Sequence, residues 1–216
     1  MYRELEERII KTRGIPRPWS YNPSSFFQRI MIALVALPAT LIALYLGFYQ
    51  WGFIDTVWDP FFGEQSQVVL DSDVSHRLRN WFVIPDAIFG FAAYLGDIVF
   101  ALAGSQRRWQ YRPWLVVVFG IDVIPLGIVG AVLVFMQAFV VGSWCTLCIV
   151  SAVISLILVV LAVDEVCSTL IYLYRFWKKT KSLSKFWQVF WGFPSPEAVE
   201  VGKSMIVREK NVGTDH

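Results

Sequence analysis

The stretch Gly142-Ser143-Trp144-Cys145-Thr146-Leu147-Cys148 is followed by fifteen residues without a charge, Ile149 to Val163. A helix of about 20 apolar residues is long enough to cross the ~30 Å hydrocarbon core of a bilayer. The stretch therefore predicts a membrane helix, from about Cys145 to Val163, that opens with a Cys-x-x-Cys pair.

Three further apolar windows of about this length precede that helix, and the second of them contains two aspartates. They run from about Ile30 to Tyr49, from about Val83 to Ala103 and from about Trp114 to Val141. The composition agrees with a lipid environment, because 56% of the 216 residues are hydrophobic, only 17% are charged and the mean hydropathy is +0.53. The first window carries Pro38 and lacks a small-residue cleavage site, so we interpret it as a retained helix and not as a signal peptide. The sequence predicts an all-α integral membrane protein, a four-helix bundle.

The distribution of lysine and arginine predicts the orientation of this bundle. Six lysine or arginine residues precede the first window, three lie between the second and third windows, and eight follow the fourth. The loop between the first two windows has two, and the turn from Gly142 to Trp144 has none. By the positive-inside rule, the N and C termini and the middle loop are cytoplasmic, and the cysteine pair lies at the outer face.

Four segments flank or connect the predicted helices. Residues 1–27 form a polar cytoplasmic arm, and the outward loop 51–81 is long enough to be functional and is expected to cap the outer end of the bundle. Residues 166–194 are basic and aromatic, which suits a segment in the inner membrane interface beside anionic lipid, and 195–216 are expected to be a flexible tail. A net charge of +2, with no basic face interleaved with aromatics, argues against a nucleic acid partner.

The spacing of Cys145 and Cys148 favours redox chemistry. Residues three apart at the start of a helix share one face, and the positive end of the helix dipole favours a thiolate there. Disulfides also persist outside the cytoplasm. Two small residues that fill a helix interface are the alternative interpretation. Cys167, roughly 28 Å further along a helix, is too distant to join the pair and is expected to be a small buried hydrophobe.

No metal site is predicted, since a zinc site needs more ligands than the pair supplies. The two histidines of the chain are His76, in the first loop, and His216, at the end.

A redox dithiol at a membrane face needs a two-electron partner that dissolves in the bilayer, and a quinone is the natural one.

Two short blocks carry a resemblance to a known family. One is the Cys145-x-x-Cys148 motif, and the other is Asp86-Ala87-Ile88-Phe89-Gly90 followed by Tyr94, which is similar to an Asn-x-Ile-Phe-Gly block with a tyrosine four residues on. Over roughly residues 28–165 the chain resembles the vitamin K epoxide reductase family, four-helix membrane thiol oxidoreductases whose bacterial members couple disulfide formation to quinone reduction.

The resemblance implies roles for single residues. Cys148 would contact the quinone, and Cys145 would exchange with a thioredoxin-like thiol protein outside the cytoplasm. Asp86 stands where the family has an asparagine that hydrogen-bonds the quinone, and it can donate to a carbonyl only when protonated. A helix-capping role after Pro85 is an equally good interpretation of Asp86. Phe89, Tyr94 and Phe62 would supply the apolar walls of a quinone site.

The first loop departs from the family pattern. Catalytic members carry two further cysteines there, whereas this loop has none, and Trp58 stands at the second of these positions. The loop sequence Trp58-Asp59-Pro60-Phe61-Phe62-Gly63 is similar to that of a bacterial branch, which implies a multi-pass protein of the bacterial inner (cytoplasmic) membrane. Two functions stay open: a quinone-linked thiol oxidoreductase, or a non-catalytic subunit that binds lipid or quinone and docks onto a larger membrane complex.

Two acids fall within the predicted membrane helices. Asp97 and Asp122 should lie roughly 10 Å from the cytoplasmic side on neighbouring helices. Buried membrane carboxylates are costly and are candidates for function. We expect an interhelical hydrogen bond between them, or packing against an arginine of the middle loop, with a proton route to the quinone as the alternative.

Overall fold

The computed structural model describes residues 15–16, 18–72, 85–193 and 195–206. Within these ranges the chain is all-helical, as predicted, and the only β contact is an isolated bridge between Pro16 and Ile206. The helices are α2 (Phe26–Gln50), α3 (Gln65–Leu70), α5 (Asp86–Leu102), α6 (Arg108–Tyr111), α7 (Pro113–Met136) with the π-helical turn η1 (Gln137–Val141), α8 (Thr146–Thr180), α9 (Leu183–Phe190) and α10 (Pro196–Met205).

Three helical segments are long and apolar enough to cross a membrane. They are α2, α7 together with η1, and α8. Helix α5 has 17 residues and contains Asp86 and Asp97, and the predicted start of this window, Val83 and Ile84, lies outside the described residues. The fourth crossing therefore stays a prediction.

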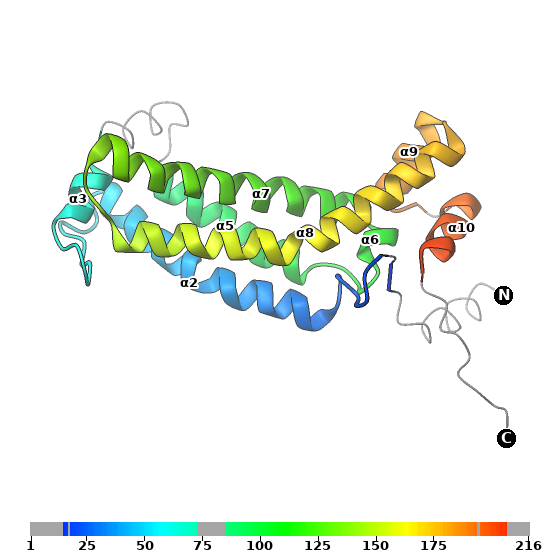
Figure 1. Cartoon of the computed structure of the whole chain (residues 1–216), viewed down its shortest axis with the longest axis horizontal. Coiled ribbons are helices and arrows are strands. Elements are labelled where there is room, and N and C mark those ends of the chain that lie inside the picture. The colour runs from blue at the N-terminus through cyan, green and yellow to red at the C-terminus, as the bar shows by residue number, and fades with distance from the viewer. Residues whose placement is uncertain (1–14, 17, 73–84, 194, 207–216) are drawn as a thin grey trace, which may run out of the picture. The chain divides into compact units, whose positions relative to one another are not determined.

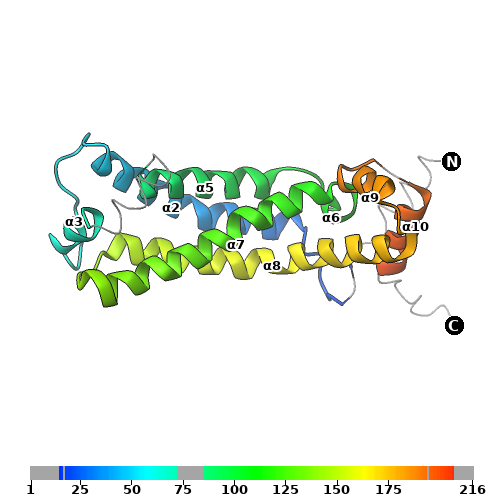
Figure 2. The ribbon, with the colours of Figure 1, turned by 90° about the horizontal axis from the view of Figure 1, so that it is seen from above.

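The chain divides into two compact units, which are described separately. The bundle unit comprises Arg29–Leu102 and Phe119–Ala162, and the terminal unit comprises the described parts of Met1–Gln28, Ala103–Val118 and Val163–His216. In the bundle unit, α2, α5, α7 and α8 run side by side (Figures 1 and 2). All four helices contribute to its core: Ile32, Ala36, Ala39, Ala43, Tyr94, Ala101, Phe119, Val123, Leu158 and Ala162. Many of these side chains are small, which lets helix backbones approach closely.

One buried arginine ties two helices of the bundle unit together. Arg29, near the start of α2, is 2% exposed and donates from Nε to the carbonyl of Ala101 at 2.6 Å and from Nη2 to the carbonyl of Leu102. These carbonyls lie in the last turn of α5, where the guanidinium supplies donors and a favourable charge for the helix dipole.

Helix α8 is longer than predicted. The sequence placed its end near Val163, at the charged pair Asp164 and Glu165, but the helix continues to Thr180. The prediction was wrong because charge alone does not end a helix, and no proline or glycine lies within this segment. The helix ends where Lys181 adopts a left-handed φ of 48°.

The terminal unit has its own core and a buried ion pair. Its core includes Trp109, Tyr172 and Phe176. Arg108 and Glu165 form a two-pronged pair, with Nε–Oε1 at 2.5 Å and Nη2–Oε2 at 2.6 Å, in which both side chains are at most 1% exposed. The hydroxyl of Ser24 donates to the same carboxylate at 2.5 Å, and Arg108 Nη1 donates to the carbonyl of Ala103 at 2.9 Å. These partners offset the cost of burying the two charges.

Part of the segment predicted as a flexible tail is helical. Helix α10 lies within residues 195–216, and its start carries ordinary helix-initiation signals: Ser195 accepts from the amide of Ala198 at 3.1 Å, and Pro196 occupies the first turn. Its buried residues Val201 and Met205 join the core of the terminal unit. The prediction overlooked this amphipathic turn pattern because the segment is short and polar on average.

The buried pair gives a stability prediction. Replacing Arg108 with Met leaves the Glu165 carboxylate buried without its charged partner, so we expect the free energy of unfolding to fall by about 3–5 kcal/mol. The matched control is Lys185→Met, which removes an exposed pair with Glu197 and should cost no more than ~1 kcal/mol. Equal effects of the two substitutions on thermal unfolding in detergent would show that the Arg108 pair does not stabilise the unit.

Candidate functional site

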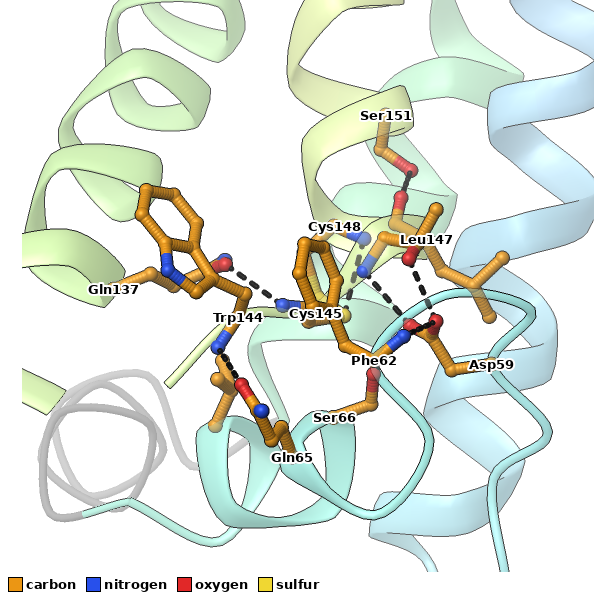
Figure 3. The surroundings of a disulfide bond; sticks show 12 residues. Asp59, Phe62, Gln65, Ser66, Gln137, Trp144, Cys145, Leu147, Cys148 and Ser151 are labelled. Atoms are coloured by element: carbon orange, nitrogen blue, oxygen red, sulfur yellow. Dashed lines mark hydrogen bonds between the residues drawn. A yellow bond between two sulfur atoms is a disulfide. The ribbon is translucent and has the colours of Figure 1, made fainter. Parts of the chain in front are cut away.

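The cysteine pair stands at the first turn of α8. Cys145 and Cys148 are joined as a disulfide with their Cα atoms 5.3 Å apart (Figure 3). Cys145 is fully buried and Cys148 is half-buried, and the amide of Cys148 donates to the sulfur of Cys145 at 3.2 Å. Cys167 is half-buried and takes no part in a disulfide.

The first loop is fixed to this helix start by Asp59. Its carboxylate is 7% exposed and accepts five hydrogen bonds. Three come from within the loop, from the amides of Phe61 and Phe62 at 2.9 Å each and from the hydroxyl of Ser66. Two come from Thr146, at 2.7 Å from its amide and 2.6 Å from its hydroxyl.

The environment of Asp59 keeps its side chain ionised. Burial raises the pKa of this carboxyl, but the hydrogen bonds that it accepts outweigh burial and hold the pKa well below the usual range of an aspartate. The charge lies at the positive end of the α8 dipole, where an anion is stabilised.

Other loop contacts complete a cover over the pair. Phe62 stacks on Trp144 with ring centroids 6.3 Å apart, and the amide of Trp144 donates to Gln65 Oε1 at 3.3 Å (Figure 3). Trp58, at the position of a shuttle cysteine in the family pattern, is 71% exposed. Its amide donates to the hydroxyl of Tyr45 at 2.8 Å. The loop thus packs over the start of α8, and the side chain of Trp58 is largely exposed.

A cavity of about 380 Å³ lies beside the pair, within the bundle unit. This volume is in the range of small-molecule sites. Cys148 lines it, together with the sequence-predicted residues Asp86, Phe89 and Tyr94. Phe62 is not part of the lining, and its role as a wall of a quinone site stays a prediction. The remaining lining is mainly aliphatic and comes from α2, α3, α5, α7, η1 and α8.

Asp86 is the first residue of α5, and its carboxylate accepts a hydrogen bond from Gln50. Gln50 Nε2 donates to Asp86 Oδ1, and Gln50 Oε1 accepts from the amide of Ala87 at 3.2 Å. The side chain of Gln50 therefore bridges the end of α2 to the start of α5 and occupies one oxygen of Asp86. The quinone-binding role of Asp86 stays a prediction.

The two membrane acids lie close to each other. Asp97 is fully buried, and within the described residues neither of its carboxylate oxygens has a hydrogen-bond partner. A side chain at Gly96 would collide with the carboxylate of Asp122, so that carboxylate lies against α5 beside Asp97. The expected hydrogen bond between the two acids is therefore wrong, and Arg108 of the middle loop pairs with Glu165. The proton route stays a prediction.

Two residues of the site were missed from the sequence. Asp59 is 87 residues from Thr146, and no local pattern connects them. Gln137, in η1, lines the cavity and accepts from the amide of Cys145 at 3.1 Å. A signal for Gln137 existed, because it is the one amide side chain in the window from Trp114 to Val141.

Within the described residues no cluster of histidine, cysteine or carboxylate side chains has the composition of a metal site. Both histidines of the chain, His76 and His216, lie outside the described residues. The chemistry-bearing groups that the structure brings together are the disulfide, the loop carboxylate Asp59 and the cavity.

An all-helical chain with membrane-spanning helices and a Cys-x-x-Cys disulfide at a helix start is a membrane thiol protein. Residues 30–163, more than half of the chain, match the model of the Vitamin K epoxide reductase family, and the chain belongs to this family. The family resemblance drawn from the two sequence blocks is confirmed. Family membership indicates a membrane thiol oxidoreductase. No curated protein matches the chain.

The loop contacts generate a prediction for the disulfide. Replacing Asp59 with Ala removes the cap of α8, worth about 0.5–2 kcal/mol, together with charged hydrogen bonds of about 1.5–3 kcal/mol each. We expect added dithiothreitol to reduce Cys145–Cys148 at least ~10 times faster in this variant, since 1.4 kcal/mol of easier opening is tenfold.

The matched control for this experiment is Asp55→Ala, an exposed carboxylate in the same loop. It should leave the reduction rate unchanged. If Asp59→Ala reacts no faster than Asp55→Ala, the loop does not protect the pair.

Proposed function

We propose that this chain is a membrane thiol-disulfide oxidoreductase that couples the Cys145–Cys148 pair to a quinone. One observation carries the proposal: Cys148 belongs to the disulfide and also lines a mainly apolar cavity of about 380 Å³. A ligand in that cavity contacts a redox-active sulfur without leaving an apolar environment. A bilayer-soluble quinone fits these two requirements.

The reaction balances without a further reactant. Oxidation of the two thiols to the disulfide releases two electrons and two protons, and these convert one quinone into one quinol. The half-buried Cys148 faces the cavity and is the sulfur assigned to the quinone. The buried Cys145 lies beneath the loop and is the sulfur assigned to the external thiol partner.

The membrane arrangement is part of this proposal. Helix α5 forms a fourth crossing, both termini are cytoplasmic, and the pair lies at the outer face of the bacterial inner membrane. The asymmetry of lysine and arginine in the flanks supports this orientation. An outward location also suits a disulfide, because thiols on the cytoplasmic side are kept reduced.

The electron donor is proposed to act on the pair directly. The chain has three cysteines, and none is in the first loop, so no internal relay connects an external thiol to Cys145. A thioredoxin-like protein outside the cytoplasm would therefore reach the pair itself. Since Cys145 is fully buried beneath the loop, the exchange requires the Asp59 contacts to open.

A non-catalytic membrane subunit is the second candidate, and the absence of loop cysteines favours it. In this case the cavity would hold lipid or quinone without turnover. Helix α9 and the residues after it expose Trp187, Trp191 and Phe193, which supply an aromatic surface for membrane lipid or for a larger membrane complex.

Thiol trapping in membranes separates the two candidates. Membranes containing the reduced chain are treated with a quinone such as decylubiquinone and then with an alkylating reagent that adds mass to each free thiol. We expect quinone to remove two of the three labels, because Cys145 and Cys148 become a disulfide while Cys167 stays a thiol. The third label on Cys167 is an internal control for labelling.

The Cys148→Ser variant should keep its labels in the presence of quinone. If Cys145 and Cys148 of the unmodified chain stay fully reduced whatever the redox state of the quinone, the oxidoreductase function is excluded. The non-catalytic membrane subunit is then the remaining candidate.

A further inference from the structure

Gln137 is a buried amide at the point where α7 gives way to a π-helical turn. Gln137 is 3% exposed and is the first residue of η1. The turn is followed by Gly142, which has a left-handed φ of 69°. π-helical turns inside α-helices are rare and occur frequently at functional sites. The turn directs the Gln137 side chain toward the start of α8 (Figure 3).

The hydrogen bond to Cys145 fixes how the Gln137 amide is oriented. A backbone N–H can only donate, so the Cys145 amide must face the carbonyl oxygen of Gln137, at 3.1 Å. The NH₂ group of the same amide is left with two donors, and it has no hydrogen-bond partner in the part of the chain that the structure describes. Within the described residues this nitrogen is not enclosed by protein atoms, and Gln137 lines the cavity, so its NH₂ group is available to a ligand there.

The other polar side chains of the cavity cannot supply a free donor. The hydroxyls of Ser72 and Ser151 donate to backbone carbonyls, at 2.7 Å to Val69 and 2.9 Å to Leu147. The hydroxyl of Tyr94 lies 3.0 Å from the carbonyl of Ser151 and 2.6 Å from the hydroxyl of Ser155.

The acids of the cavity, Asp86 and Asp122, are acceptors in their ionised form, and Asp86 already accepts from Gln50. Among the described side chains that line the cavity, Gln137 therefore holds the unused donor that does not depend on protonation of an acid.

We propose that the NH₂ group of Gln137 donates a hydrogen bond to a carbonyl oxygen of the cavity ligand and so positions it against Cys148. This inference rests on the proposed quinone-linked function and names the residue that recognises the quinone. Because one amide group contacts both Cys145 and the ligand, it aligns the carbonyl with the disulfide. Asp86 could donate a hydrogen bond to a quinone carbonyl only when protonated, whereas the neutral amide of Gln137 donates without a change of protonation.

The test compares two ligands of equal shape on the full-length, disulfide-bonded chain in nanodiscs. Duroquinone carries two carbonyls and durene carries none, and both bear four methyl groups. Binding is followed by quenching of tryptophan fluorescence for duroquinone and by displacement of duroquinone for durene. Replacing Gln137 with Met removes the donor but keeps the side-chain length.

We expect Gln137→Met to weaken duroquinone binding about tenfold, which is the loss of one good hydrogen bond, and to change durene binding by less than about twofold. The matched control is Gln65→Met. Gln65 likewise accepts from a backbone amide at this end of the bundle, that of Trp144, but does not line the cavity. This control should bind both ligands like the unmodified chain.

A second variant adds a readout that a purely structural role would not give. In Gln137→Glu, a protonated side chain donates and an ionised one does not, so duroquinone affinity should fall as the pH rises, whereas the unmodified chain should show no such trend. The inference is overturned if the unmodified chain binds duroquinone and both variants bind it equally well at every pH. If the unmodified chain itself binds durene as tightly as duroquinone, the site does not recognise carbonyls and the quinone-linked function fails with it.

Discussion

The carboxylate of Asp59 is the interaction on which the site depends. A side chain that is 7% exposed and ionised is costly unless it is fully hydrogen-bonded. Its five donors come from two segments, the loop around Phe61 and the first turn of α8 at Thr146. The carboxylate is satisfied only when both segments are in place. Loop folding and helix initiation are therefore coupled through one group, and the burial of Cys145 follows from it.

This coupling gives the two cysteines different surroundings. Cys145 lies beneath the loop and is fully buried, whereas Cys148, three residues on, lines the cavity with Gln137 and Asp86. In the family pattern the loop carries thiols, but here the contacts of Asp59 and Phe62 make it a cover over the start of α8. The consequence for the proposed function is that access to Cys145 is controlled by opening of the loop, whereas Cys148 lines the cavity directly.

The sequence predicted the parts of the fold that depend on local pattern. Long apolar windows located α2, α5, α7 and the start of α8, and cysteine spacing located the pair. The extension of α8 to Thr180 was not predicted because the uncharged window ends before Asp164 and Glu165, and the pairing of Glu165 with Arg108 from a distant segment cannot be read from local sequence. The hydrogen-bond partners of Asp59 were not predicted for the same reason, because tertiary contacts between separate segments leave no periodic signal in the sequence. Gln137 was detectable as an isolated amide in an apolar window, but its orientation required the geometry of η1.

The most direct test of the account is a single turnover with the purified, fully reduced chain. Under anaerobic conditions the reduced protein is mixed with excess decylubiquinone, and the loss of quinone absorbance is followed by stopped flow. The account predicts that one quinone is converted to quinol for each chain, at the same rate at which the Cys145 and Cys148 thiols disappear. Quinone that is bound but not consumed, with both thiols still free, would contradict it.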